Sequence, residues 1–321
     1  MKKCFAGVLA LVMLFSFMFA GVSVAEEKKI SVVTTIFPVY DWARAVAEDD
    51  GSVEITMLLD SGVDLHSYQP TARDIMKVAT CDVFVYVGGE SDEWVEGALT
   101  EAVNPDMAVV DLLDALGDDV KEEEIVEGME AEEEEAEGEE EIEYDEHVWL
   151  SLRNARALVK AIADALSKAD PANADAYAAN AEAYGDRLAA LDAEYAAAVA
   201  QADFDTLLFG DRFPFRYLVD DYGLSYYAAF VGCSAESEAS FETIVFLAGK
   251  VDELGLSTVL TIEGDNHRIA ETIVGNTAAK DAKVLTMDSM QATTGGDVKN
   301  GATYLGVMEK NLDVLKQALT K

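Results

Sequence analysis

Histidine is rare in this sequence, with three in 321 residues. His66 lies in a turn-rich segment after an apolar run, and His147 lies where a long acidic run ends. A single histidine in a loop is usually a solvated surface residue. Each of these two, however, is closely followed by an aromatic residue, Tyr68 or Trp149, and this favours a buried pair of ligands for a divalent cation.

Other kinds of chemistry leave little trace in the sequence. The third histidine, His267, lies at the predicted start of a helix and is interpreted as a surface residue. There is no GxSxG nucleophile motif, no phosphate-binding P-loop and no GxGxxG dinucleotide motif. Three histidines in the whole chain also leave little scope for acid-base catalysis.

The composition excludes one class of partner. Asp and Glu number 62 against 23 Lys and Arg, which gives a formal net charge of −39. A chain this acidic repels phosphate, so nucleic acid is not expected as a partner. Half of the residues are apolar, which is enough for a packed globular body, and the length favours two lobes over one.

The N-terminus has the pattern of an export signal. Lys2 and Lys3 precede an uncharged run over residues 4–25 that ends in small residues. We predict a signal peptide over residues 1–25 and an exported protein, in the periplasm or on the outer face of the cytoplasmic membrane. An uncleaved anchor is the alternative, since the run is just long enough to span a bilayer. A lipoprotein is not expected, because Cys4 precedes the run.

Removal of the signal leaves two cysteines, Cys81 and Cys233. In an exported protein an even pair is compatible with a disulfide. Cys81 begins an apolar strand-like run, so a buried free thiol is an equal alternative. A metal role for Cys233 is less favoured, because no second cysteine lies at a ligand-like spacing.

Strands alternate with helices over residues 30–117, which predicts a first α/β lobe with a parallel sheet. Thr71 and Asp74 form a capping box at the start of one helix. The predicted strands are residues 30–37, 53–59, 83–87 and 107–112, and the other helical stretches are residues 39–48 and 93–101.

Residues 118–146 form an acidic run with 18 acidic residues and one basic residue, Lys121. Like charges at this density repel, so we predict a solvated, disordered loop. Its position before His147 suggests that it raises the local concentration of divalent ions. A solvated spacer or a halophile-like excess of charge is an equally good interpretation.

Residues 147–200 are predicted to end the first lobe and to contain two helices, over residues 151–168 and 172–200. The second helix would be ~43 Å long at ~1.5 Å per residue, enough to brace two lobes. Its larger apolar side chains fall on one face: Tyr177, Tyr184, Leu188, Leu191 and Tyr195. Alternation resumes over residues 204–321 as a second α/β lobe, and two such lobes leave a crevice at their strand ends. The predicted strands there are residues 206–209, 226–230, 258–262 and 283–287, and the predicted helices are residues 215–222, 241–254, 268–276 and 303–319.

Several segments resemble the metal-binding solute-binding proteins of ABC transporters, the ZnuA-like zinc and manganese uptake family. They are VVTTIFPVYDWARAV, GVDLHSYQPTARDI, CDVFVYVGGESDEWVEGAL and YDEHVWLSLRNA in the first half, with YLVDDYGLSYYA, AESEASFETI and VLTIEG in the second. The resemblance runs from about Ile30 to the C-terminus and is broken by the acidic run. It implies two α/β lobes joined by a long helix, and a monomer that passes a metal ion, zinc before manganese, to a membrane permease.

The resemblance also implies a ligand set. His66 and His147 match the first two family ligands, and Asp288 matches the carboxylate ligand of the second lobe. Arg212 stands where the family has a His or Glu, and arginine cannot coordinate a metal.

Four alternatives follow from this departure. Asp211 or Glu263 takes over as a ligand, the site has three ligands and water, or Arg212 pairs with Asp288 and binding is lost. Two other functions also remain open: an exported metallohydrolase, with Glu263 as the one candidate general base, and a metal-dependent adhesin.

Overall fold

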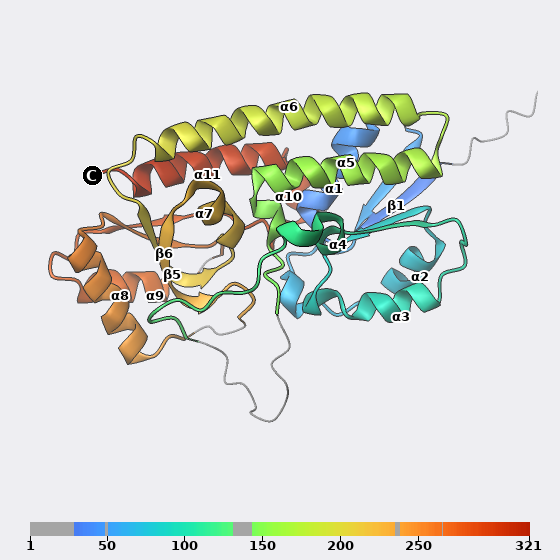
Figure 1. Ribbon diagram of the computed structural model, residues 1–321. Coiled ribbons are helices and arrows are strands. Elements are labelled where there is room, and N and C mark those ends of the chain that lie inside the picture. The colour runs from blue at the N-terminus through green and yellow to red at the C-terminus, as the bar shows by residue number, and fades with distance from the viewer. Residues whose placement is uncertain (1–28, 49–50, 131–142, 235–237, 265) are drawn as a thin grey trace, which may run out of the picture.

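The computed structural model describes residues 29–48, 51–130, 143–234, 238–264 and 266–321. The predicted signal peptide, residues 1–25, lies outside this part. Two four-stranded sheets, each made only of parallel pairs among the described strands, form two α/β lobes joined by helices (Figure 1). The predicted fold class is confirmed.

The first sheet has the strand order β2-β1-β3-β4. It comprises β1 (Ile30–Thr34), β2 (Val53–Met57), β3 (Val83–Tyr86) and β4 (Ala108–Asp111). Strands β1 and β3 lie inside the sheet, and their sequences, ISVVT and VFVY, are mostly apolar or β-branched, as is typical of buried parallel strands. The helices of this lobe are α1 (Phe37–Ala47), α2 (Ala72–Thr80), α3 (Trp94–Thr100) and α4 (Leu112–Leu116).

Local signals at two helix starts have the expected physical basis. Pro38 lies in the first turn of α1, where its missing N–H has no helical partner to lose. Thr71 and Asp74 form the predicted capping box of α2, with both reciprocal hydrogen bonds present.

The second sheet has the order β6-β5-β7-β8. Its first strand, β5 (Thr206–Phe213), is longer than predicted and shifts register against β6 between Phe209 and Arg212. Arg212 follows this irregularity and contacts Asp64 of the first lobe. The other strands are β6 (Ser225–Val231), β7 (Thr258–Thr261) and β8 (Lys283–Thr286), and the helices are α7 (Arg216–Tyr222), α8 (Phe241–Leu254), α9 (Arg268–Asn276), α10 (Gly295–Lys299) and α11 (Tyr304–Ala318).

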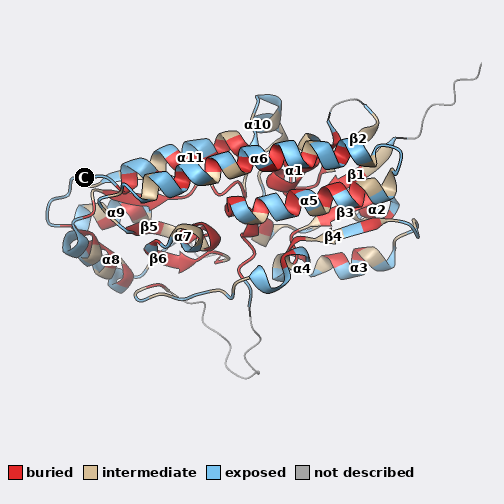
Figure 2. Ribbon diagram, turned by 45° about the horizontal axis from the view of Figure 1, so that its top comes forward, coloured by how far each residue is buried: buried red, intermediate tan, exposed pale blue. Residues whose placement is uncertain are grey.

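Helix α6 (Ala174–Val199) lies along both lobes beside α5 (Leu152–Ala169) and α11 (Figure 1). Asn180 donates to the carbonyl of Val46 in the first lobe at 3.0 Å, and Tyr195 donates to that of Met308 in the second at 2.6 Å. Its predicted apolar face is buried, while its other face is exposed (Figure 2). The helix therefore braces the two lobes. None of the described helices combines the length and apolar character that crossing a membrane requires.

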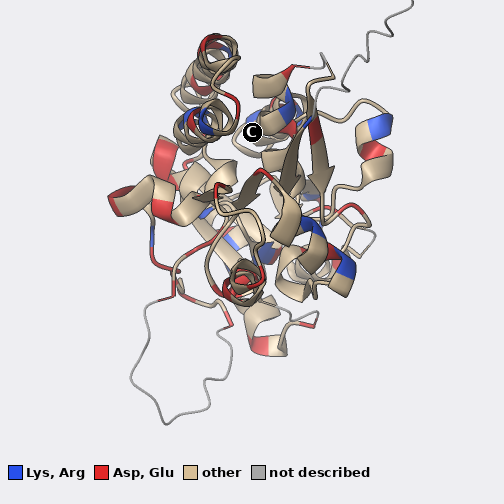
Figure 3. Cartoon of the chain, turned by 90° about the vertical axis from the view of Figure 1, so that its right-hand side faces the viewer, with Lys and Arg blue, Asp and Glu red and all other residues tan. Residues whose placement is uncertain are grey.

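Residues 131–142 of the predicted acidic loop lie outside the described residues, and its described ends, residues 118–130 and 143–146, are mostly exposed or half-buried. Acidic residues lie on loops as well as on helices of this chain (Figure 3). The two described ends of the acidic run are held by a few specific contacts. The backbones of Glu122 and Tyr144 form an isolated antiparallel β-bridge. The backbone N–H of Glu130 donates to the carbonyl of Ala229 in β6 at 2.9 Å. Arg216 lies 3.4 Å from Glu124 and offsets part of the charge. Backbone pairing and a nearby cation thus outweigh repulsion at these positions.

Candidate metal centre

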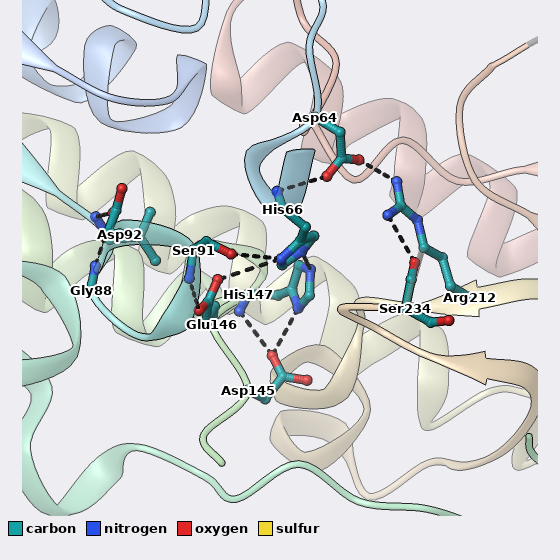
Figure 4. A network of polar contacts seen from close by, with 11 residues as sticks. Asp64, His66, Gly88, Ser91, Asp92, Asp145, Glu146, His147, Arg212 and Ser234 are labelled. Atoms are coloured by element: carbon teal, nitrogen blue, oxygen red, sulfur yellow. Dashed lines mark hydrogen bonds and ion pairs between the residues drawn. The ribbon is translucent and has the colours of Figure 1, made fainter. Parts of the chain in front are cut away.

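The two histidines come from separate parts of the chain and meet between the lobes. His66 lies in the short turn Leu65–Ser67 that follows β2, and Asp64 caps this turn by accepting from the His66 N–H at 3.1 Å. His147 precedes the turn Val148–Leu150 that leads into α5. Although 81 positions separate them, their Nε2 atoms lie 3.2 Å apart (Figure 4).

Each imidazole ring uses its other nitrogen for a separate partner. Nδ1 of His66 lies 2.7 Å from the Ser91 hydroxyl, and Nδ1 of His147 lies 3.0 Å from the Asp145 carboxylate. Such partners fix the tautomer that leaves Nε2 free to bind a metal. Two nitrogens bound to one Zn²⁺ at ~2.0–2.1 Å with tetrahedral angles lie ~3.3 Å apart. The spacing of the pair therefore suits a shared Zn²⁺ ion.

The surroundings of the two imidazoles shift their pKa values in opposite directions. Burial and the neighbouring His147 lower the pKa of His66 to about 3. Burial also opposes the charge on His147, but the carboxylates of Asp145 and Glu146 outweigh it and raise the pKa of His147. A cation bound by both Nε2 atoms needs both lone pairs free, so metal capture competes with protonation of the pair.

Two buried carboxyl groups lie beside the histidines, and burial raises the pKa of one of them, Glu146. Asp145 and Glu146 are each 2% exposed. One oxygen of Glu146 accepts from the Ser91 N–H at 2.9 Å, while the other has no hydrogen-bond partner and lies 3.6 Å from Nδ1 of His66. Within the described residues, neither carboxylate forms an ion pair with a lysine or arginine. Buried carboxylates that lack such a partner favour the binding of a cation.

A third potential ligand is Cys233, which follows β6 in the second lobe. In the described part of the chain, His66, His147 and Cys233 are the one group of three potential ligands, with ligand atoms within 4.8 Å of one another. Cys81 and Cys233 are both free thiols, so the disulfide considered from the sequence is not formed. Sequence reasoning disfavoured Cys233 because it looked for a second nearby cysteine.

The backbone next to Cys233 also bears on the site. A Cβ on Gly232 would lie 2.8 Å from Cε1 of His147 and 2.9 Å from the carbonyl oxygen of Phe213. Only glycine therefore lets the end of β6 come this close to the histidine ring. The sequence carries no stronger signal of this approach than a glycine directly before a cysteine, just after a predicted strand.

The three predicted carboxylate ligands are not part of this group. Asp288 accepts from the Met290 N–H at 2.8 Å, and burial together with Glu263 raises its pKa to about 6. Asp211 accepts from the Thr261 hydroxyl at 2.5 Å. Glu263 accepts from the N–H of Ser289 at 2.7 Å, so its role is to hold the loop after β8. Their role as ligands of the ion therefore stays a prediction.

Gln291, in the loop after β8, reaches the two histidines. Sequence reasoning missed this residue. With its amide nitrogen facing Asp64, the nitrogen lies 3.2 Å from Nε2 of His66 and the oxygen lies 3.2 Å from Nε2 of His147. Glutamine had no sequence signal here, because its position depends on the path of the loop.

Arg212 pairs across the interface between the lobes, but not with Asp288. Its guanidinium donates to the Asp64 carboxylate and, at 3.4 Å, to the carbonyl of Ser234 (Figure 4). The possibility that Arg212 neutralises Asp288 is therefore wrong. Arg212 instead ties the second lobe to the turn that carries His66.

Comparison with known proteins agrees with this architecture. A zinc-binding lipoprotein AdcA of Streptococcus pneumoniae is 34% identical over 91% of this chain, and the zinc uptake protein ZnuA of Bacillus subtilis is 27% identical over 93% of this chain and 90% of its own length. The chain spans 56% of the length of the streptococcal relatives. The crystal structure of the Zn(II)-bound ZnuA-like domain of Streptococcus pneumoniae AdcA covers 91% of this chain and 99% of that domain, with 29% identity and a TM-score of 0.71.

A sequence model of one family covers nearly all of the described chain. Its description, "Zinc-uptake complex component A periplasmic", and the names of these relatives are those of binding proteins and not of enzymes. The match extends over residues 32–318, and the chain therefore belongs to the ZnuA family.

Proposed function

We propose that this chain is an exported solute-binding protein that captures one Zn²⁺ ion between its two lobes and passes it to the membrane permease of an ABC transporter. The observation that carries the proposal is the pairing of His66 and His147, whose Nε2 atoms face each other at 3.2 Å. Family membership supports it, as does the prediction of an export signal over residues 1–25.

Zinc is preferred over manganese because of the atoms that the site offers. Imidazole nitrogens suit borderline cations such as Zn²⁺, whereas Mn²⁺ favours oxygen ligands. The carboxylates of Asp145 and Glu146 act behind the histidines, as partners that orient the rings and balance the charge. Asp288, Asp211 and Glu263 already accept hydrogen bonds from their own lobe, and we do not assign the ion to them.

Release follows from the way in which the lobes meet. Trp149 donates to the carbonyl of Ser289 at 2.8 Å, and Arg212 pairs with Asp64; both contacts join the two lobes beside the histidines. The bound ion stabilises the arrangement in which these contacts are made. A permease that binds the separated lobes more tightly shifts the protein toward low affinity and frees the ion.

Zinc titration of the purified chain, in competition with a chromophoric chelator, tests the proposal. We expect one zinc per chain and a loss of affinity of more than about 100-fold in His66→Ala, since loss of an outer partner alone weakens such sites about 10- to 100-fold. His267→Ala is the matched control and should bind as the wild type does. Equal zinc affinity in His66→Ala and the wild type would contradict the proposal.

Delivery to a permease needs a cellular measurement. Cells that carry His66→Ala as their one copy of this gene should stop growing when zinc is chelated and should recover when zinc is restored. Cells that carry His267→Ala should grow in both media. Normal growth of the His66→Ala cells under chelation would show that the site does not serve uptake.

A further inference from the structure

The second lobe presents an unexpected side chain to the histidine pair. Arg212, at the position where relatives are expected to carry a ligand, is held by Asp64 and by the carbonyl of Ser234. The carboxylates of Asp211 and Asp288 accept hydrogen bonds from Thr261 and from Met290, within their own lobe. Besides Gln291, Cys233 also reaches the pair from this lobe: its sulfur and one nitrogen of each histidine lie within 4.8 Å of one another.

From this arrangement we propose that the Cys233 thiolate is the second lobe's ligand, so that zinc is held by two imidazoles and one sulfur. The inference rests on the proposed capture of zinc by His66 and His147 and adds the third ligand. When the ion binds, the thiol proton leaves to solvent and the sulfur forms a bond to zinc of ~2.3 Å. Sulfur and nitrogen then lie ~3.6 Å apart at tetrahedral angles, so the sulfur needs to move by only about 1 Å.

Buried charge gives an independent reason to place a cation here. The oxygen of Glu146 that faces His66 has no hydrogen-bond partner, and the side chain is 3% exposed. Asp145 is also buried. Both hydrogen bonds described for its carboxylate come from His147. A divalent cation offsets the combined charge of these carboxylates and a thiolate, which a single imidazolium does not.

A thiolate from the second lobe has two consequences for transport. The ion then bridges the lobes directly, because His66 belongs to the first and Cys233 to the second. Separation of the lobes removes the sulfur first and leaves a weaker pair of histidines, which provides a route for release. Sulfur also favours zinc, cobalt and cadmium over manganese, so the site rejects the harder ion.

Cobalt provides a direct probe, because a thiolate bound to Co²⁺ gives a charge-transfer absorption in the near ultraviolet that nitrogen and oxygen ligands do not give. The wild type and Cys81→Ser, the matched control, should both show this band. Cys233→Ser should lack it and should bind zinc at least about tenfold more weakly, while it keeps the wild-type circular dichroism. A band of wild-type strength in Cys233→Ser would overturn the assignment.

A second measurement uses the wild-type chain and does not depend on the folding of the variant. Bound zinc should slow the alkylation of Cys233 by iodoacetamide, measured by peptide mass spectrometry, with buried Cys81 as the internal reference. In His66→Ala at the same zinc concentration this protection should be lost. If the wild type binds zinc but Cys233 reacts at the same rate with and without it, the sulfur is not a ligand and the histidine site alone stands. A wild type that binds no zinc overturns both proposals.

Discussion

The guanidinium of Arg212 and the carboxylate of Asp64 form an ion pair between the two lobes, directly beside the histidine pair. Their side chains are 18% and 19% exposed, so the pair is largely desolvated. Asp64 also caps the turn that carries His66. A residue that cannot bind a metal therefore holds the metal-binding turn against the second lobe.

Loss of this ion pair should speed the release of zinc. In Arg212→Gln we expect zinc to dissociate about tenfold faster, because removal of one partner of a desolvated charge pair acts mainly on dissociation. Stopped-flow transfer of zinc to a fluorescent chelator measures this rate. Arg216→Gln, which loses an ion pair with Glu124 away from the histidines, should release zinc at the wild-type rate. An unchanged rate in Arg212→Gln would mean that the pair does not hold the lobes together.

Asp145 should matter to zinc binding without touching the ion. Its carboxylate accepts from both the N–H and Nδ1 of His147 at 2.8 and 3.0 Å, so it sets the tautomer and orientation of the ring. We expect Asp145→Ala to lower zinc affinity about 10- to 100-fold in chelator competition. Asp164→Ala, which removes an exposed carboxylate paired with Lys160, is the control. Affinity within about twofold of the wild type in Asp145→Ala would argue against this role.

Much of the fold could be predicted because it depends on local pattern. Helices α8 and α9 have the predicted bounds, residues 241–254 and 268–276, since polar boundaries flank a clear apolar period. Strand β5 was predicted to end at residue 209, yet it continues to Phe213. Its continuation depends on pairing with β6 across a register shift, which is a tertiary effect that no single stretch of sequence encodes.

The site could be predicted from the sequence only where a ligand is a rare residue type in a recognisable pattern. His66 and His147 are rare residues in patterned loops, and the structure brings them together. Asp288 was predicted from the family resemblance, whereas Gln291, in the same loop after β8, reaches the histidines without a signal in the sequence. Cys233 reaches them through the end of a strand in the other lobe. Which side chain occupies a shared space depends on how two lobes dock, and spacing along the chain does not contain that information.

Gly232 should prove necessary for the approach of β6 to His147. In Gly232→Ala the new methyl group would lie 2.8 Å from Cε1 of His147, so the ring or the strand end must move. We expect a loss of stability of ~1–3 kcal/mol, as for an overpacked core, together with weaker zinc binding. Gly249→Ala, in α8 with no neighbouring atom within 4 Å of the new methyl, is the control and should be stabilised by ~0.5–1 kcal/mol. Urea unfolding measures both. A Gly232→Ala protein as stable as the wild type would show that the strand end has room to adjust.

Asp92 should make the fold less stable as the pH rises from about 4 to 7. One of its oxygens accepts from the N–H groups of Val87 and Gly88, and the other is buried without a hydrogen-bond partner. Burial raises the pKa of Asp92 from 3.8 to about 7. The two N–H hydrogen bonds oppose this shift, and the nearby Glu146 adds to it. Since the folded chain holds this proton more tightly than the unfolded chain, the stability present below pH 4 declines as the pH rises through 7, by ~4 kcal/mol at 1.36 kcal/mol per pH unit.

The variant Asp92→Asn isolates this contribution, because asparagine keeps an oxygen for the two N–H groups and carries no charge at any pH. Urea unfolding of the metal-free chain between pH 4.5 and 7.5, with a chelator present, should give a stability difference between Asp92→Asn and the wild type that grows with pH in favour of the variant. General repulsion in this acidic chain affects both proteins and cancels in the difference. Asp186→Asn, which removes an exposed carboxylate from α6, should show a constant difference. If the difference for Asp92→Asn is also constant, Asp92 is already ionised in the folded chain throughout this range, and the buried oxygen must have a compensating partner.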